Sequence, residues 1–114
     1  MATLRAEINR LHAQICNGLA DPSRILILYT LYEKPHNVSE LGEALDISQP
    51  TVSRHLKVLR ERHMVSAQRD GQAVYYSLTD KRIIEALDLL RSVLASRLQD
   101  QSELAESVQQ DTSV

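Results

Sequence analysis

Residues 37–61 read NVSELGEALDISQPTVSRHLKVLRE, a stretch that predicts two short helices joined by a tight turn. Asn37 with Glu40 three residues later is a capping-box pattern, which marks the start of the first helix. Ser48 favours the capping position of the second helix, because its hydroxyl can accept a hydrogen bond from a backbone amide. The stretch therefore predicts a helix-turn-helix. Its helices are expected over about residues 38–45 and 49–62.

The second of these helices separates an apolar face from a polar one. At about 100° per residue, Val52, Leu56 and Leu59 fall on one side and predict the packing face. The opposite side begins with small polar groups and then becomes basic. A helix with that start fits the major groove of DNA, with its first turn at the base edges. The residues of the opposite face are Gln49, Pro50, Ser53, Arg54 and Lys57.

The flanking sequence predicts a β-hairpin and three further helices. The runs Val65–Arg69 and Ala73–Leu78 bracket Asp70-Gly71, which is a strong hairpin signal. The further helices are expected over about residues 3–19, 22–33 and 80–98, the last of them capped by Thr79 or Asp80. The result is a mainly α fold with a small β-hairpin, a winged helix-turn-helix with an additional helix at each end.

Each terminal helix carries an apolar stripe. The chain has no Trp and no Phe, so Leu, Ile and Val must form a modest core, and self-association would add burial. Packing within the same chain is the alternative for either stripe. Residues 1–98 are expected to form one DNA-binding and dimerisation domain, and residues 99–114 an acidic, disordered tail. The two stripes are Leu4, Ile8, Leu11, Ile15 and Leu19, and Ile83, Leu87, Leu90, Leu94 and Leu98.

Basic residues gather near the helix-turn-helix although the chain as a whole is slightly acidic. The 114 residues carry a net charge of −2. Residues 48–72 hold five basic and two acidic residues, a local charge of +3, so the remainder carries −5. A basic patch on an acidic body is expected of a face that binds DNA, and a mixed solvated surface is the alternative.

Other classes of protein find no support in the sequence. Cys16 is the single cysteine and cannot form a disulfide within the chain. No apolar run is long enough to span a membrane, and the N-terminus has no apolar signal core, which predicts a soluble cytoplasmic protein. No nucleophile with a base, phosphate loop or paired metal motif occurs, so no catalytic residue and no enzyme are expected.

Three segments of the chain together resemble the ArsR/SmtB family of small bacterial winged-helix repressors. They are GLADPSRILIL at 18–28, ISQPTVSRHLKVL at 47–59 and RDGQAVYYSL at 69–78. With the flanking helices, the resemblance covers about residues 3–98. It implies a homodimer, assembled by the first and last helices, that represses transcription by binding double-stranded operator DNA.

The side chains at the expected DNA face suit distinct contacts. Gln49 can pair with adenine and Arg54 with guanine through two hydrogen bonds each, whereas Lys57 is better placed for phosphate. At the hairpin, Arg69 and Gln72 suit phosphate or the minor groove. The full set of expected DNA-contacting residues is Ser48, Gln49, Thr51, Ser53, Arg54, Lys57, Arg69 and Gln72.

The signal that such a repressor would sense is not identified by the sequence. The metal sites familiar in the family are absent in their usual form, because Asn37 and Ser39 replace cysteines and no histidine follows His63. His12 and Cys16 lie four residues apart, and two copies of the pair could hold a soft metal ion. The alternatives are a buried apolar thiol beside a solvated histidine, or a disulfide between two copies of Cys16. Of the remaining histidines, His55 is expected to pack on the flank of its helix, and His36 and His63 are expected at the surface.

A protein-interaction module that reuses the winged fold without binding specific DNA is the serious rival, since fold does not fix function. The polar, basic face of residues 49–62 favours DNA, because a protein-binding face would have little reason to exclude large apolar groups.

Overall fold

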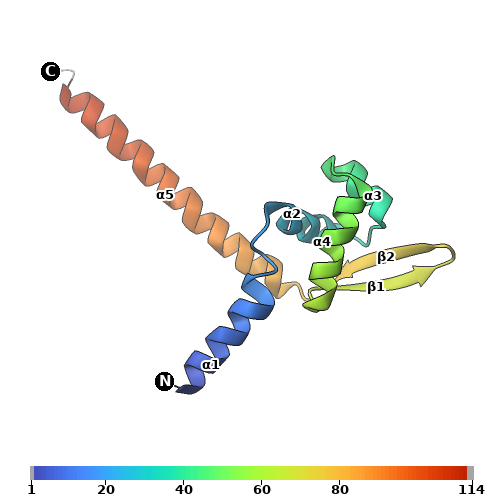
Figure 1. Cartoon of the computed structure of the whole chain (residues 1–114). Helices are drawn as coiled ribbons and strands as arrows, with labels where there is room; N and C mark the ends of the chain where they lie inside the picture. The colour runs from blue at the N-terminus through green and yellow to red at the C-terminus, as the bar shows by residue number, and fades with distance from the viewer. Residues whose placement is uncertain (1, 113–114) are drawn as a thin grey trace. The chain divides into compact units, whose positions relative to one another are not determined.

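The computed structural model describes the backbone of residues 2–112 and the side chains of residues 2–104. The chain divides into two units, Met1–Lys81 and Arg82–Val114. The order of elements confirms a winged helix-turn-helix with an additional helix at each end (Figure 1). The elements are α1 (Ala2–Leu11), a π-helical turn η1 (His12–Cys16), α2 (Pro22–Glu33), α3 (Val38–Leu45), α4 (Gln49–Glu61), β1 (Val65–Asp70), β2 (Ala73–Leu78) and α5 (Arg82–Thr112).

The core of the first unit lies among α2, α3, α4 and the start of the hairpin. Val52, Leu56 and Leu59 are buried, which confirms the predicted packing face of α4. In α2, Ile27, Leu28 and Leu31 are buried, but Leu26 is 51% exposed. The apolar residues of α2 are therefore buried on one side of the helix and open to solvent on another. The other buried apolar residues of this unit are Leu41, Met64 and Val65.

The turn between α3 and α4 is held by backbone hydrogen bonds to Gly42. The amides of Asp46 and Ile47 both donate to the carbonyl of Gly42, the latter over 3.0 Å. Asp46 has the left-handed φ of 54° that ends a helix in this way. At the start of α3, Asn37 and Glu40 form the predicted capping box. Local signals therefore set both ends of α3.

A left-handed residue also ends α4. His63 has a φ of 58°, and the next amide, that of Met64, donates to the carbonyl of Leu59 over 2.9 Å. The hydroxyl of Thr79 donates to the carbonyl of His63 over 2.8 Å. Thr79 therefore ties the end of the hairpin to the end of α4, and α5 begins later, at Arg82.

The hairpin turns through two residues, Gly71 and Gln72. Asp70, expected in the turn, is instead the last residue of β1 and pairs with Ala73, and Gly71 takes the positive φ of 65°. The tip of the hairpin extends away from α2, α3 and α4 (Figure 1). His36, expected at the surface, is 8% exposed, because its backbone pairs with that of Tyr76 in an isolated bridge. Bridge formation draws the loop before α3 onto β2.

The expected first helix over residues 3–19 is shorter and ends in a wider turn. The α-helix stops at Leu11, and the amide of Asn17 donates to the carbonyl of His12, five residues back, over 2.9 Å. No residue of α1 or η1 is buried. The stripe from Leu4 (50% exposed) to Ile15 (37% exposed) is therefore open to solvent in this single chain.

The expectation that the last helix ends near residue 98 was wrong, whereas the expectation that residues 99–114 fray or remain disordered stays a prediction. Helix α5 continues without interruption to Thr112, and residues 113–114 lie outside the described part. No proline or glycine breaks the segment, and Gln99 donates to Glu103 one turn ahead over 3.3 Å. Ile84 and Leu87 are buried, while Leu89, Leu90, Val93, Leu94, Leu98 and Leu104 are exposed. Within the described residues, no helix is long and apolar enough to cross a membrane.

Candidate nucleic-acid interface

One face of α4 is polar and open to solvent. Gln49, Ser53, Arg54 and Lys57 are exposed, and Thr51 is half-buried. They lie there because the buried residues of α4 recur at helical spacing and turn the remaining positions outward. The face therefore offers amide, hydroxyl, guanidinium and ammonium groups, and no large apolar side chain, to a partner.

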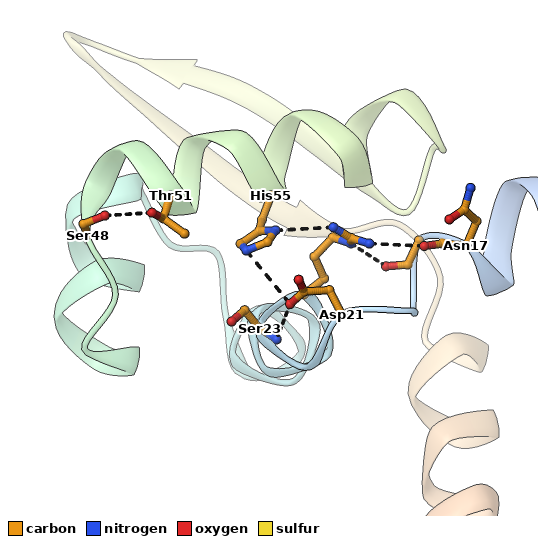
Figure 2. A network of polar contacts seen from close by, with 8 residues as sticks. Asn17, Asp21, Ser23, Ser48, Thr51 and His55 are labelled. Carbon is orange, nitrogen blue, oxygen red and sulfur yellow. Dashed lines mark hydrogen bonds and ion pairs between the residues drawn. The ribbon is translucent and has the colours of Figure 1, made fainter.

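The start of α4 differs from the expectation in one detail. Ser48 occupies the capping position, but its side chain accepts no backbone amide. Its hydroxyl donates instead to Oγ1 of Thr51 over 2.8 Å (Figure 2). This bond orients both hydroxyls at the first turn of α4, where the sequence places contacts to bases or phosphates.

The hairpin adds a second exposed polar surface. Arg69 lies on β1 opposite Val74, and Gln72 lies in the two-residue loop. Both side chains, which the sequence predicts to contact DNA, are exposed. The wing therefore presents a cation and an amide near its tip.

A groove between α4 and β2 contains residues that the sequence did not single out. Its volume is about 380 Å³. Arg60 adds a cation next to Lys57, and Tyr76 adds an aromatic ring and a hydroxyl. No periodicity in α4 predicts Tyr76 as its neighbour, because the hairpin brings it there. The groove is lined by Ser53, Leu56, Lys57, Arg60, Glu61 and Tyr76.

The buried side of α4 carries a polar network rather than apolar contacts alone (Figure 2). His55, expected to pack on the flank of the helix, has a side chain only 12% exposed. Its Nδ1 lies 3.4 Å from Nη1 of Arg24, and its Nε2 lies 4.0 Å from Oδ1 of Asp21. The backbone amide of Ser23 donates to Asp21 over 2.8 Å and lowers the pKa of that carboxyl, and the nearby charge of Arg24 acts in the same direction. The network joins the first turn of α2 to the middle of α4.

The two residues considered for sensing both lie in η1. Cys16 is exposed in the single chain, so its thiol is not buried by its own domain. His12 is exposed as well. Among the side chains that the structure describes, no group of three or more histidine, cysteine or carboxylate residues could hold a metal ion. A metal site built by His12 and Cys16 of two copies stays a prediction.

Comparison with known proteins links this arrangement to one family. Residues 21–67 match the family described as bacterial regulatory protein, arsR family. The helix-turn-helix transcriptional regulator Rv0081 of Mycobacterium tuberculosis is 37% identical over 100 residues, which cover 87% of this chain and 88% of the relative. The crystal structure of Rv0081 matches with a TM-score of 0.73 and 38% identity, over 82% of this chain and 95% of that chain.

Two other proteins extend the comparison. A transcriptional repressor SmtB homologue of Synechocystis is 36% identical over 88 residues, which cover 77% of this chain and 64% of the relative. Mb0332 of Mycobacterium bovis, a homodimeric winged helix-turn-helix DNA-binding domain, shares the fold with a TM-score of 0.72 at 24% identity, over 83% of this chain and 87% of that chain. The chain belongs to the arsR family of bacterial regulatory proteins, whose members are transcriptional regulators.

Proposed function

We propose that this chain is a homodimeric repressor that binds operator DNA through α4, the recognition helix, and leaves it when a signal arrives. The exposed polar face of α4 is the observation that carries the proposal. A recognition helix reads bases with side chains near its N-terminus, and these side chains must be accessible to the DNA. Gln49 and Arg54 meet that requirement and have the hydrogen-bonding groups that read adenine and guanine.

Phosphate contacts on either side of α4 would position the helix in the groove. Lys57 and Arg60 lie about one and two helical turns beyond Arg54 along α4, beside the groove that Tyr76 lines. Arg69 and Gln72 on the wing suit the phosphates or the minor groove of the flanking DNA. These groups would supply affinity that depends on salt, whereas Gln49 and Arg54 would supply specificity.

The exposed apolar stripes of α1 and α5 support a dimer. In a two-fold dimer the two recognition helices would lie about 34–36 Å apart, the distance that matches successive turns of one DNA face. The homodimeric state of Mb0332, which shares the fold, supports the same assembly.

Titration of fluorescently labelled DNA tests the proposal. The DNA is the region upstream of the chain's own gene, with a scrambled sequence of equal length as the control, each at two salt concentrations. We expect tighter binding to the upstream region, and a steep loss of affinity as salt rises. Equal binding of both DNAs, or no binding at low salt, would favour the protein-interaction module.

Variants of α4 separate base contacts from phosphate contacts. Arg54→Ala should weaken operator binding by about 1–3 kcal/mol and relax the preference at one base pair. Arg54→Lys is the matched control: it keeps the charge but loses the two-pronged pairing, so specificity should fall while the salt dependence stays. Lys57→Ala should weaken binding to all sequences alike and lower the salt slope by about one. Unchanged operator affinity in Arg54→Ala at fixed salt would mean that α4 faces the DNA differently.

The signal is a separate prediction. A soft metal ion held by His12 and Cys16 of two copies would appear as metal in the purified protein, and Cys16→Ser should remove it. If the purified protein contained no metal and still left the operator in cells, the signal would be a different ligand.

A further inference from the structure

The turn between η1 and α2 is joined to the recognition helix by Arg24. Nε of Arg24 donates to the carbonyl of Gly18 over 2.8 Å, and Nη2 donates to the carbonyl of Asn17 over 3.2 Å. The remaining arm of the guanidinium, Nη1, reaches Nδ1 of His55 in the middle of α4, 3.4 Å away. One side chain therefore contacts two carbonyls of the turn and one ring of the recognition helix.

The same turn lies against the end of the recognition helix. A Cβ atom on Gly18 would lie 2.8 Å from Sδ of Met64 and 3.0 Å from Cδ of Arg62. Gly18 is buried, and Arg62 caps the C-terminus of α4. The turn therefore contacts α4 directly at this end, as well as through Arg24.

The chemistry of the contact constrains the ring of His55. A guanidinium can only donate hydrogen bonds, so Nδ1 of His55 must accept, and the ring proton must be on Nε2. That nitrogen faces Oδ1 of Asp21 at 4.0 Å (Figure 2). Arg24 thus orients the ring through Nδ1, and the ring lies on the side of α4 away from the exposed polar face.

We propose that Arg24 is a positioning residue that couples the turn after η1 to the recognition helix through His55. A displacement of α1 or η1 would then reach α4 through this side chain and change how well α4 reads the operator. The inference rests on the proposed function, and it identifies the contacts through which the N-terminal helix would influence the DNA-binding face of α4.

Three single variants and one double variant test the coupling. Arg24→Lys keeps the charge but cannot make three divergent contacts. His55→Leu removes the acceptor, and His55→Asn is its matched control, because the amide oxygen can replace Nδ1 as the acceptor. The double variant combines Arg24→Lys with His55→Leu. Affinities for operator and scrambled DNA are measured at a temperature at which thermal unfolding curves show every variant folded.

We expect Arg24→Lys and His55→Leu each to weaken operator binding about tenfold and to change affinity for scrambled DNA less than twofold, because phosphate contacts tolerate misorientation. His55→Asn should bind nearly as the natural chain does. The double variant should bind operator no more weakly than the weaker of the two single variants, since each single variant already removes the same contact between Arg24 and His55. If Arg24→Lys weakened binding to operator and scrambled DNA equally, Arg24 would be a phosphate contact. If the losses of binding free energy in the two single variants added up in the double variant, Arg24 and His55 would act independently. Either result overturns the inference.

Hydrogen exchange gives an independent readout of the path. The amides of Asn17 and Leu19 donate to carbonyls of η1, and the amide of Ala20 donates to the carbonyl of Asn17. Operator DNA should slow their exchange in the natural chain and have a smaller effect in Arg24→Lys. Unchanged exchange in the natural chain on binding operator would contradict the coupling. Failure of the natural chain to prefer its operator would instead refute the proposed function, so the two failures are distinguishable.

Discussion

Replacement of Gly42 by alanine should destabilise the helix-turn-helix, because the turn after α3 passes close to this residue. A Cβ atom there would lie 2.8 Å from the carbonyl oxygen of Ile47, and 3.7 Å from Cγ of Gln49. The first contact is with backbone, which cannot rotate away as a side chain can. The amide of Ile47 is also hydrogen-bonded to the carbonyl of Gly42 over 3.0 Å, so the turn cannot retreat without lengthening that bond.

The magnitude follows from two opposing effects. Alanine gains about 0.5–1 kcal/mol over glycine in a helix interior. Overpacking a tight site costs about 1–3 kcal/mol, and backbone is the less compliant neighbour. We therefore expect a net loss of about 1–2 kcal/mol of unfolding free energy, which corresponds to a fall in Tm of roughly 5–15 °C for a domain of this size. Operator affinity should fall as well, because Ile47 directly precedes Ser48, the N-cap residue of the recognition helix.

Thermal and urea unfolding followed by circular dichroism provide the assay. Glu43→Ala is the matched control, since the neighbouring residue of the same helix is exposed and its replacement should change stability by less than about 0.5 kcal/mol. A Gly42→Ala variant as stable as the natural chain, or more stable, would refute the close approach of the turn to Gly42.

Three further predictions concern the dimer, the end of α4 and the acid limit of stability. Ile8→Glu, on the exposed stripe of α1, should shift sedimentation equilibrium from dimer to monomer with the helical content retained. His63→Val should lower stability by about 1 kcal/mol, because a β-branched residue tolerates the φ of 58° poorly, whereas His63→Asn should be nearly neutral in urea unfolding. The lowered pKa of Asp21 means that its contribution to stability is present above about pH 4 and is lost as the pH falls through the lower folded value. Asp21→Asn, which still caps α2, should therefore flatten the fall of Tm with acid; an unchanged acid profile would contradict the effect of Ser23 on this carboxyl.

Local patterns predicted most of the winged helix-turn-helix. The capping box at Asn37, the helical spacing of Val52, Leu56 and Leu59, and the turn signal at Gly71 each depend on residues close together in the chain. Such signals act through backbone hydrogen bonds and side-chain periodicity, so they can be read before any tertiary contact is known. The polar face of α4 followed from the same periodicity.

The length of α5 was not predicted from composition. The acidic charge of residues 99–114 suggested a solvated coil. Helix formation depends instead on propensity and on pairs one turn apart, such as Gln99 with Glu103, and the segment contains no residue that breaks a helix.

The amino-acid order alone set the succession of helices and strands and the choice of side chains on the outer face of α4, because both depend on neighbours within a few residues. Folding in three dimensions set which side chains meet behind that face. Arg24 and His55 are 31 positions apart, and no local pattern pairs them. Their contact, the burial of His36 against β2 and the fit of Gly18 at the end of α4 arise when separate elements pack, since only packing brings distant donors, acceptors and van der Waals surfaces within reach of one another.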